Sequence, residues 1–403
     1  MEKLTKICIA GKNNIAIKVT EFILENYENI ELCVIFNQND DGQNGFQRSF
    51  RKYCKLKNIL ETNLEEIYDT EDLLFLSLEF DKIVKPHLFS SNRLFNIHFS
   101  YLPEYKGMYT SALPIFHGAF YTGVTLHKID KGIDTGDIIE RQKIFINDEL
   151  TAEELYLNYI EFGSSLVINN IDRLIKGDYS SKPQSIHKST YYSKNSIDYS
   201  KLLINLNSTA FQIQRQVNAF VFPAYQLPEI FDTKIYKVNI TNEKSALRAG
   251  NIIEETKFYF KVSSIDYDLF VYKDLRDELY DIAKQGDIGR LDYFFENNYS
   301  INQRSKEGWD IAIIAAYNGR FEFLDYLIKR YNWDINTCNN NGTSLIMYIM
   351  TRASSSNDIS YLSYFLEKFN LDANSYDYQQ ISVIDYARRY GNKEVIQLIE
   401  KFI

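Results

Sequence analysis

The sequence predicts a mostly parallel α/β domain, then a small β-rich subdomain, then a domain of helical repeats. Short apolar runs alternate with helix-spaced segments at the start of the chain, alternating runs fill residues 234–274, and the last third repeats a helical template. We place the domain boundaries at 1–180, 181–273 and 274–403. Several domains also suit the length of 403 residues, which exceeds the usual size of one domain.

The first domain begins with strands and helices in alternation. Each expected strand is a short apolar run, and the first run ends in Gly11, as a buried strand would. The elements expected are a strand at 5–11, a helix at 15–27, a strand at 30–36, a helix at 46–57, and strands at 73–78, 94–98 and 123–129. This order is typical of a Rossmann-like fold, which has helices on both faces of its sheet and binds ligands at the carboxyl ends of the strands.

The second domain begins with a change in amino-acid composition. Residues 181–199 are polar and rich in Tyr, which indicates an extended loop, and a helix is expected near 209–219. After FVFPAYQLP at 220–228, four short alternating runs predict the strands of a small β-rich subdomain. These runs lie at 234–240, 249–255, 257–264 and 267–274.

The third domain contains an internal repeat. Asn302 and Gly308 recur as Asn336 and Gly342, and three segments share a short helix, a Gly-containing turn and a second helix. A spacing of about 34 residues with this texture resembles ankyrin repeats, although their TPLHxA signature is here WDIAIIA and TSLIMYI. An unrelated helical domain is the alternative. Because stacking buries faces that no single repeat can bury alone, three to four repeats are expected.

Composition argues against several functional classes. The chain is 45% hydrophobic with a net charge of -9 and dispersed acidic residues, which disfavours a general affinity for nucleic acid. The cysteines are scattered, so we interpret Cys8, Cys33, Cys54 and Cys338 as reduced core residues. No segment resembles a signal peptide or a bilayer span, so a soluble cytoplasmic protein is expected.

Metal and nucleotide-cofactor motifs are missing from the sequence. Neither a GxGxxG nor a Walker A pattern occurs, which disfavours nicotinamide or ATP chemistry. We expect no metal site, because the four histidines outside the strand end at 94–98 lack partners at metal-ligand spacing. These are His87, His117, His127 and His187.

Three polar residues carry the chemistry that the sequence indicates. Asn96 and His98 are two apart on an expected strand end, so their side chains point to the same side, and Asp134 lies in a loop rich in Gly and Asp. Such a set suits acyl transfer to an amine. His98 can accept the proton or contact the oxyanion, Asn96 can donate to the oxyanion, and Asp134 can orient His98 or relay the proton. No Ser or Cys nucleophile is required.

The segments around these residues resemble a known family. FNIHFSYLPEYKG at 95–107 and GVTLHKIDKGIDTGDI at 123–138 are similar to the signature of the N10-formyltetrahydrofolate-dependent formyltransferases. Four further segments are similar to the branch that formylates dTDP-linked amino-dideoxysugars, closest to the dTDP-3-amino-3,6-dideoxyglucose type with a C-terminal ankyrin domain. They are GKNNIAI, FLSLEFDKIVKP, YKGMYTSALPIFHG and FVFPAYQLP.

The resemblance implies roles for individual residues. It implies that formyl transfer is catalysed by the trio Asn96, His98 and Asp134. It also implies that the folate co-substrate lies against Ser77, Leu78, Glu79, Phe80, Asp81, Asp130 and Ile133. Candidates for the dTDP-sugar are Lys12, Asn13, Met108, Tyr109, Lys194, Asn195, Phe222 and Tyr225. For the aromatic candidates, ordinary core packing is the alternative to stacking on thymine.

The expected activity is N-formylation of a dTDP-3-amino-3,6-dideoxyhexose, for O-antigen or surface-glycan biosynthesis, by a homodimer. One alternative enzyme formylates the 4-amino isomer, and another formylates methionyl-tRNA, although the latter should need a cationic surface. An alternative of another class is an ankyrin-based binding protein whose catalytic half is silent. In the repeat domain, Trp309 is either a core residue or part of a groove that binds a regulatory ligand or a protein.

Overall fold

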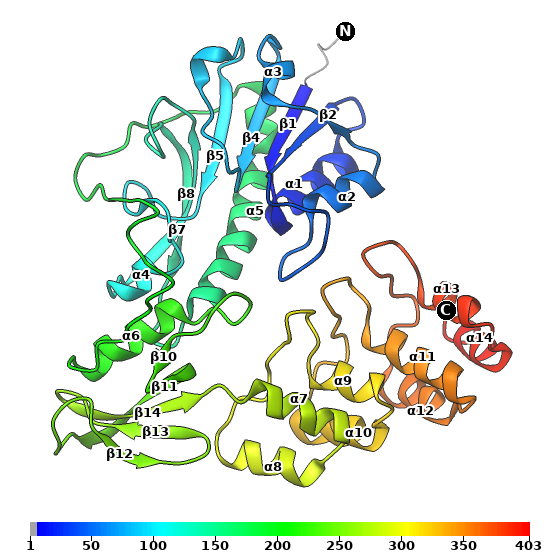
Figure 1. The fold of residues 1–403 in the computed structure, drawn as a ribbon. Coiled ribbons are helices and arrows are strands. Elements are labelled where there is room, and N and C mark those ends of the chain that lie inside the picture. Colours follow the sequence, from blue (N-terminus) through cyan, green and yellow to red (C-terminus); the bar gives the residue numbers. More distant parts are fainter. Residues whose placement is uncertain (1–5) are drawn as a thin grey trace. The chain divides into compact units, whose positions relative to one another are not determined.

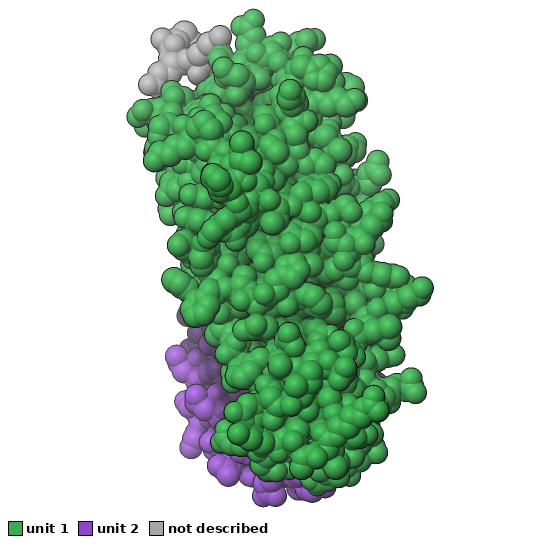
Figure 2. All heavy atoms as spheres, turned by 90° about the vertical axis from the view of Figure 1, so that its left-hand side faces the viewer, with its two compact units in different colours: residues 1–43, 49–274 green, residues 44–48, 275–403 purple. Residues whose placement is uncertain are grey.

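The structure of the protein is a computed structural model, which describes residues 6–403. These residues form two compact units, coloured separately in Figure 2. The first unit runs to residue 43 and from 49 to 274, and the second comprises residues 44–48 and 275–403. Among residues 6–403, no helix combines the length and the apolar character needed to cross a membrane.

A seven-stranded sheet forms the centre of the first unit (Figure 1). Its strand order is β3-β2-β1-β4-β5-β7-β8. The strands are β1 (Lys6–Gly11), β2 (Glu31–Phe36), β3 (Leu60–Glu61), β4 (Leu73–Leu78), β5 (Arg93–His98), β7 (Tyr121–Lys128) and β8 (Ile138–Phe145). The pairs from β3 to β5 are parallel, whereas β7 is antiparallel to both of its neighbours. The expected Rossmann-like α/β fold is therefore confirmed, with a mixed edge.

Apolar residues of alternate strand positions pack on both faces of this sheet. On one face, α1 (Asn13–Asn26) and α5 (Ala152–Lys176) contribute to one continuous core with Ile7, Ile9 and Leu76. On the other face, Ile67 of the short helix α3 (Leu64–Ile67) packs with Cys8 and Phe75. The remaining helices of the sheet region are α2 (Phe50–Leu56), η1 (Pro86–Leu88) and α4 (Leu113–Phe116).

Several elements in this region were not expected from the sequence, and the two longest are β8 and α5. Strand β8 and the 25-residue helix α5 occupy residues 138–176, for which no element was expected. Helix α5 starts at a capping box of Thr151 and Glu154 and ends at Gly177 in the left-handed region. Helix α2 is also shorter than expected, because Ser49 caps it at residue 50.

The small β-rich subdomain is an antiparallel sheet of five strands in the order β10-β11-β14-β13-β12. Its strands are β10 (Glu229–Ile230), β11 (Thr233–Lys244), β12 (Ile252–Glu255), β13 (Tyr259–Val262) and β14 (Tyr267–Lys273). Helix α6 (Ala210–Phe220) precedes it and contacts β11. A separate two-stranded sheet pairs β6 (Lys106–Gly107) with β9 (Tyr191–Tyr192).

Residues 275–403 contain four pairs of helices, as the helical repeat predicts (Figure 1). A Gly or Asn with positive φ stands between the helices of each pair: Gly286, Gly319, Asn357 or Gly391. The pairs are α7 (Arg276–Gln285) with α8 (Ile288–Glu296), α9 (Ile311–Tyr317) with α10 (Phe321–Tyr331), α11 (Leu345–Ser356) with α12 (Ser360–Phe369), and α13 (Val383–Tyr390) with α14 (Lys393–Glu400). Each pair contributes buried apolar side chains to the stack.

Candidate active site

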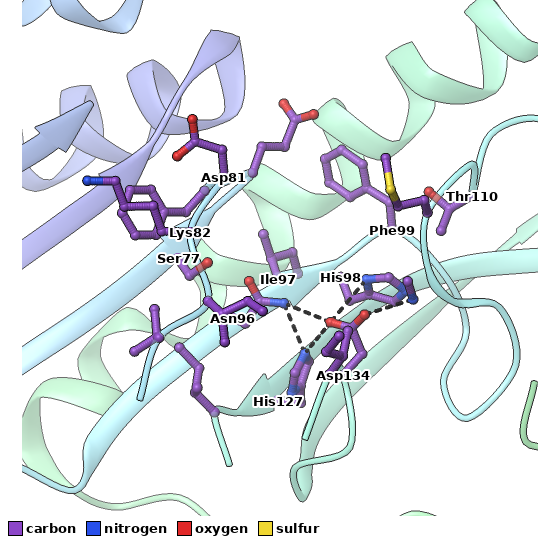
Figure 3. Close-up of a pocket in the computed structure, with 18 of the residues that line it drawn as sticks. Ser77, Asp81, Lys82, Asn96, Ile97, His98, Phe99, Thr110, His127 and Asp134 are labelled. Carbon is purple, nitrogen blue, oxygen red and sulfur yellow. Dashed lines mark hydrogen bonds and ion pairs between the residues drawn. The ribbon is translucent and has the colours of Figure 1, made fainter. Parts of the chain in front are cut away.

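A cavity of about 670 Å³ opens at one edge of the seven-stranded sheet (Figure 3). Residues directly after β1, β2 and β4 line it, as do the last three residues of β5, Asn96, Ile97 and His98. This is the place at which a Rossmann-like sheet binds its ligands, because loops leave the carboxyl ends of the parallel strands there. The cavity holds both polar and apolar side chains, so it can take a ligand of mixed character.

The structure brings Asn96, His98 and Asp134 together in this cavity. Nδ1 of His98 lies 3.4 Å from Oδ1 of Asp134, and Nδ2 of Asn96 lies 3.5 Å from the same oxygen. Nε2 of His98 is 2.8 Å from the backbone carbonyl oxygen of Tyr105. Because a carbonyl only accepts, Nε2 of His98 carries hydrogen, and its Nδ1 faces Asp134.

Asp134 is held in an unusual backbone conformation and an unusual charge environment. Its φ is +54°, and the N–H of Gly107 donates to its Oδ2 over 2.9 Å. Burial alone would raise the pKa of Asp134, but the imidazoles of His98 and His127 and the Gly107 N–H outweigh burial and hold that pKa well below its usual range. Asp134 is therefore an ionised acceptor at neutral pH.

Glu79 provides a second carboxylate in the same cavity. The hydroxyl of Tyr156 donates to Glu79, with both carboxylate oxygens at 3.0 Å, and Nδ2 of Asn13 donates to Oε2 over 3.0 Å. Burial raises the pKa of Glu79, although Lys12 and these hydrogen bonds oppose the rise. Its backbone also has a positive φ of +60°, directly after the end of strand β4.

Comparisons with known proteins agree with this geometry. Residues 60–171 match the formyl transferase family, and residues 279–328 match the family of ankyrin repeats. WlaRD, a sugar 3N-formyl transferase solved with dTDP and 5-N-formyl-THF, is 44% identical, with a TM-score of 0.63 over 67% of this chain and 98% of WlaRD. This chain belongs to the sugar N-formyltransferases. A Helicobacter canadensis N-formyltransferase, solved with folinic acid and dTDP-3-aminofucose, is 43% identical, with a TM-score of 0.63 over 67% of this chain and all of that one.

Methionyl-tRNA formyltransferases are more distant relatives of this sugar N-formyltransferase. The enzyme of Coxiella burnetii (strain CbuK_Q154) is 30% identical over 164 residues, which cover 40% of this chain and 52% of that protein. The enzyme of Clostridioides difficile (strain 630) is 24% identical over 286 residues, 66% of this chain and 90% of that protein. The chain thus spans about half the length of the first of these relatives.

Most of the residues expected to contact folate line the cavity of this sugar N-formyltransferase. They are Ser77, Glu79, Phe80, Asp81, Asp130 and Ile133. The side chain of Leu78 is buried in the sheet core and does not line the cavity, so its expected contact with folate stays a prediction.

Only some of the residues expected to hold the dTDP-sugar line the cavity. Lys12, Met108 and Lys194 line the cavity, whereas Asn13, Tyr109, Asn195, Phe222 and Tyr225 do not. Three of the latter have other contacts: Asn13 donates to Glu79, Tyr109 donates to the Lys194 carbonyl over 2.7 Å, and the Asn195 N–H donates to Ser193. The rings of Phe222 and Tyr225 lie 4.8 Å apart, and Tyr225 is 67% exposed.

Trp309 lines a second cavity, of about 400 Å³, within the ankyrin region. Its ring is half-buried and lies 5.0 Å from that of Tyr317 and 5.3 Å from that of Tyr348. Asp277, Asp281 and Lys284 of α7 line the same cavity. Trp309 is therefore at the wall of a cavity, and it directly precedes Asp310, the N-cap of α9.

Several lining residues of the first cavity were not identified from the sequence. Asn37 is buried, and its Oδ1 has no hydrogen-bond partner within residues 6–403. His127 was considered only as a metal ligand, yet its Nε2 lies 3.0 Å from Nδ2 of Asn96. Other such residues are Lys82, Ile83, Val84, Phe99, Thr110, Ile129 and Tyr191. In the part of the chain that the structure describes, no three His, Cys, Asp or Glu side chains are grouped to hold a metal ion.

Proposed function

We propose that the chain transfers the formyl group of N10-formyltetrahydrofolate to the amino group of a dTDP-3-amino-3,6-dideoxyhexose, for O-antigen or surface-glycan biosynthesis. The observation that carries the proposal is the convergence of Asn96, His98 and Asp134 in one cavity. Two relatives at 43–44% identity, one solved with dTDP and the other with dTDP-3-aminofucose, support the substrate class.

The cavity has side chains suited to both substrates. Phe80, Val84 and Ile133 offer apolar surface to a flat pterin, and Lys12 and Lys194 offer positive charge to a pyrophosphate. Its volume of about 670 Å³ lies within the range of ligand sites that take molecules of this size.

The folate supplies a formyl group that is already activated, and the chain's residues manage charge and protons. His98 takes the proton from the attacking amine on Nδ1, which then faces the carboxylate of Asp134. Asn96 donates through Nδ2 to the formyl oxygen as that oxygen gains negative charge. The bond from the sugar nitrogen to the formyl carbon forms as the bond to N10 breaks. His98 returns the proton to N10, so the products are the N-formyl sugar and tetrahydrofolate.

The test is a product analysis with the full-length protein. Incubation with N10-formyltetrahydrofolate and a panel of dTDP-3-amino and dTDP-4-amino sugars should give a mass gain of one formyl group on a 3-amino sugar. Formylation of only 4-amino sugars would reassign the substrate, and formylation of methionyl-tRNA would point to the reaction of the more distant relatives. No product with any acceptor would favour a binding protein whose catalytic half is silent.

We also propose that the Trp309 cavity binds a ligand or partner that regulates the enzyme. Trp309 and the exposed Tyr317 offer flat aromatic surfaces beside the charged residues Asp281 and Lys284. The alternative is a purely structural role for the repeats. As a further part of the proposal, the enzyme is a cytoplasmic homodimer, which light scattering and cell fractionation would test.

A further inference from the structure

His127 is buried beside the catalytic residues, and the proposed reaction gives it no task. It lies on β7 directly opposite Asn96 of β5, and it is 2% exposed. Its Nδ1 is 2.7 Å from the backbone carbonyl oxygen of Lys128, and its Nε2 is 3.0 Å from Nδ2 of Asn96. Figure 3 shows the imidazole below Asn96, with Asp134 beside both.

These contacts determine which atoms carry hydrogen. A carbonyl oxygen only accepts, so Nδ1 of His127 carries hydrogen toward Lys128, and the lone pair of Nε2 faces Asn96. The same Nε2 lies farther from Oδ1 of Asp134, at 3.7 Å, so Asn96 is its nearer partner. The carboxylate of Asp134 also only accepts, and its Oδ1 lies 3.5 Å from the same terminal atom of Asn96. Both neighbours therefore require the NH₂ group of Asn96 at this position, with the amide oxygen directed away from them.

We propose that His127 is a positioning residue that holds the NH₂ group of Asn96 toward the reaction centre. One N–H of Asn96 is taken by Nε2 of His127. The other points to Asp134 over 3.5 Å, which is longer than an ordinary N–H···O bond, so it is free to bind an oxygen that gains negative charge. Without the acceptor on His127, only the longer contact with Asp134, at 3.5 Å, still orients the amide, so its NH₂ group is held less firmly toward that charge. The inference rests on the proposed function only for the identity of this oxygen.

Two substitutions test the two ring nitrogens of His127 separately. Gln places its terminal atoms near Nε2, so His127→Gln keeps an acceptor for Asn96 and loses the bond to Lys128. Asn places its terminal atoms near Nδ1, so His127→Asn keeps the bond to Lys128 and loses the acceptor. Since loss of an oxyanion donor lowers kcat about 10²- to 10³-fold, we expect His127→Asn to lose about 10- to 100-fold and His127→Gln about threefold at most. KM for both substrates should change little.

A double-mutant cycle shows whether His127 acts through Asn96. In an Asn96→Ala background, His127→Asn should have no further effect on kcat. Three results would overturn the proposal. The losses of kcat from His127→Asn and Asn96→Ala could multiply in the double variant, the Asn and Gln variants could lose kcat equally, or His127→Asn could keep the wild-type kcat. If His127→Asn does not fold, His127→Gln decides alone, because a folded His127→Gln protein with about a hundredfold loss contradicts the proposal.

A second measurement does not depend on the reaction. In nitrogen-15 NMR spectra of the full-length protein, the side-chain NH₂ pair of Asn96 is identified by its absence from Asn96→Ala. We expect one proton of this pair to be shifted downfield and protected from exchange in the wild type and His127→Gln, and neither effect in His127→Asn. If the Asn96 NH₂ protons of the wild type are unshifted and exchange freely with solvent, the proposal is overturned even if formyl transfer is observed. A shifted pair in a protein that formylates no amino sugar would leave the positioning role and remove the proposed function.

Discussion

Asp134 and Glu79 line the same cavity, but their surroundings change their pKa values in opposite directions. Two imidazoles and a backbone N–H keep Asp134 ionised, whereas Glu79 is buried, and Lys12 and two hydrogen bonds only partly offset that burial. Two carboxylates whose environments separate their pKa values are typical of sites with divided roles. We therefore assign Asp134 to stabilising the protonated His98. Glu79 is better suited to holding its neighbours Asn13 and Tyr156 in place.

The first prediction concerns His98 and Asp134. His98→Asn or Asp134→Asn should lower kcat by about two orders of magnitude or more, because each removes a group that holds the proton or stabilises the charge. The exposed His87 lies outside the cavity, so His87→Asn is the matched control and should keep the wild-type rate. Steady-state kinetics together with melting curves check this. A near-normal rate in a folded variant would remove that residue from the mechanism.

The second prediction concerns the pH dependence of stability through Glu79. Its pKa is raised above the ordinary 4.5 in the folded state, so folding favours the protonated form. As pH rises above 4.5, Glu79 loses its proton in the unfolded chain but keeps it in the folded protein. The free energy of unfolding therefore falls with pH up to the raised pKa of the folded state, and is constant above it. The melting temperature of Glu79→Gln relative to the wild type should therefore increase from about pH 4 to pH 8. The exposed Glu149→Gln should show no such trend, and a flat difference for Glu79→Gln would contradict the assignment.

At the scale of elements, the short pair β6–β9 holds the loop that carries Asp134. Gly107 on β6 has a φ of +86° and donates its N–H to Asp134. A Cβ atom at Gly107 would stand 2.2 Å from the carbonyl oxygen of Tyr192 on β9, so the two strands approach too closely for any side chain there. The carboxylate of the trio thus depends on backbone packing more than 20 residues away, since its donor lies at residue 107.

We predict that Gly107→Ala lowers kcat about 10²-fold, because the strand must shift and take the N–H away from Asp134. Gly42 is the matched control, because its φ is +85° and a Cβ atom added there would have no other atom within 4 Å. Gly42→Ala should cost about 1 kcal/mol of stability from its backbone conformation, which both variants share, but leave kcat unchanged because it lacks the close contact with Tyr192. Kinetics and urea unfolding of both variants check this. Equal effects on kcat would show that β6 does not position the carboxylate.

The elements also show how far sequence patterns reach. The apolar runs predicted β1, β2, β4 and β5 within a residue or two, because buried strands are almost wholly apolar. Helix α5 was missed, although its capping box and terminal Gly are local signals that mark both of its ends. The role of His127 could not be predicted, because its position opposite Asn96 depends on the antiparallel register of β5 and β7. No local pattern encodes that register.

For the whole molecule, we predict catalysis without an added metal ion. No group of three candidate ligands lies together within residues 6–403, and the proposed chemistry uses only protein donors and acceptors. Dialysis against a chelator should leave the rate of formyl transfer unchanged. A loss of rate that zinc or magnesium restores would reveal a metal site, and the unchanged melting curve of the dialysed protein serves as the control.

The last prediction concerns the ankyrin region as a unit. Residues 275–403 form most of a compact unit of their own, and the cavity that carries the trio is lined only by residues from 12 to 194. A protein that ends at Lys273 should therefore be soluble and active, with altered kinetics if the Trp309 cavity regulates the enzyme. Trp333 is the only other tryptophan and does not line that cavity, so Trp333→Ala is the control for Trp309→Ala. Initial rates against dTDP-sugar concentration should be measured for the full-length protein, the truncated protein, Trp309→Ala and Trp333→Ala. They distinguish a regulatory role of the repeats from a structural one. A change shared by the truncated protein and Trp309→Ala supports regulation, identical curves remove it, and an insoluble truncated protein favours a structural role.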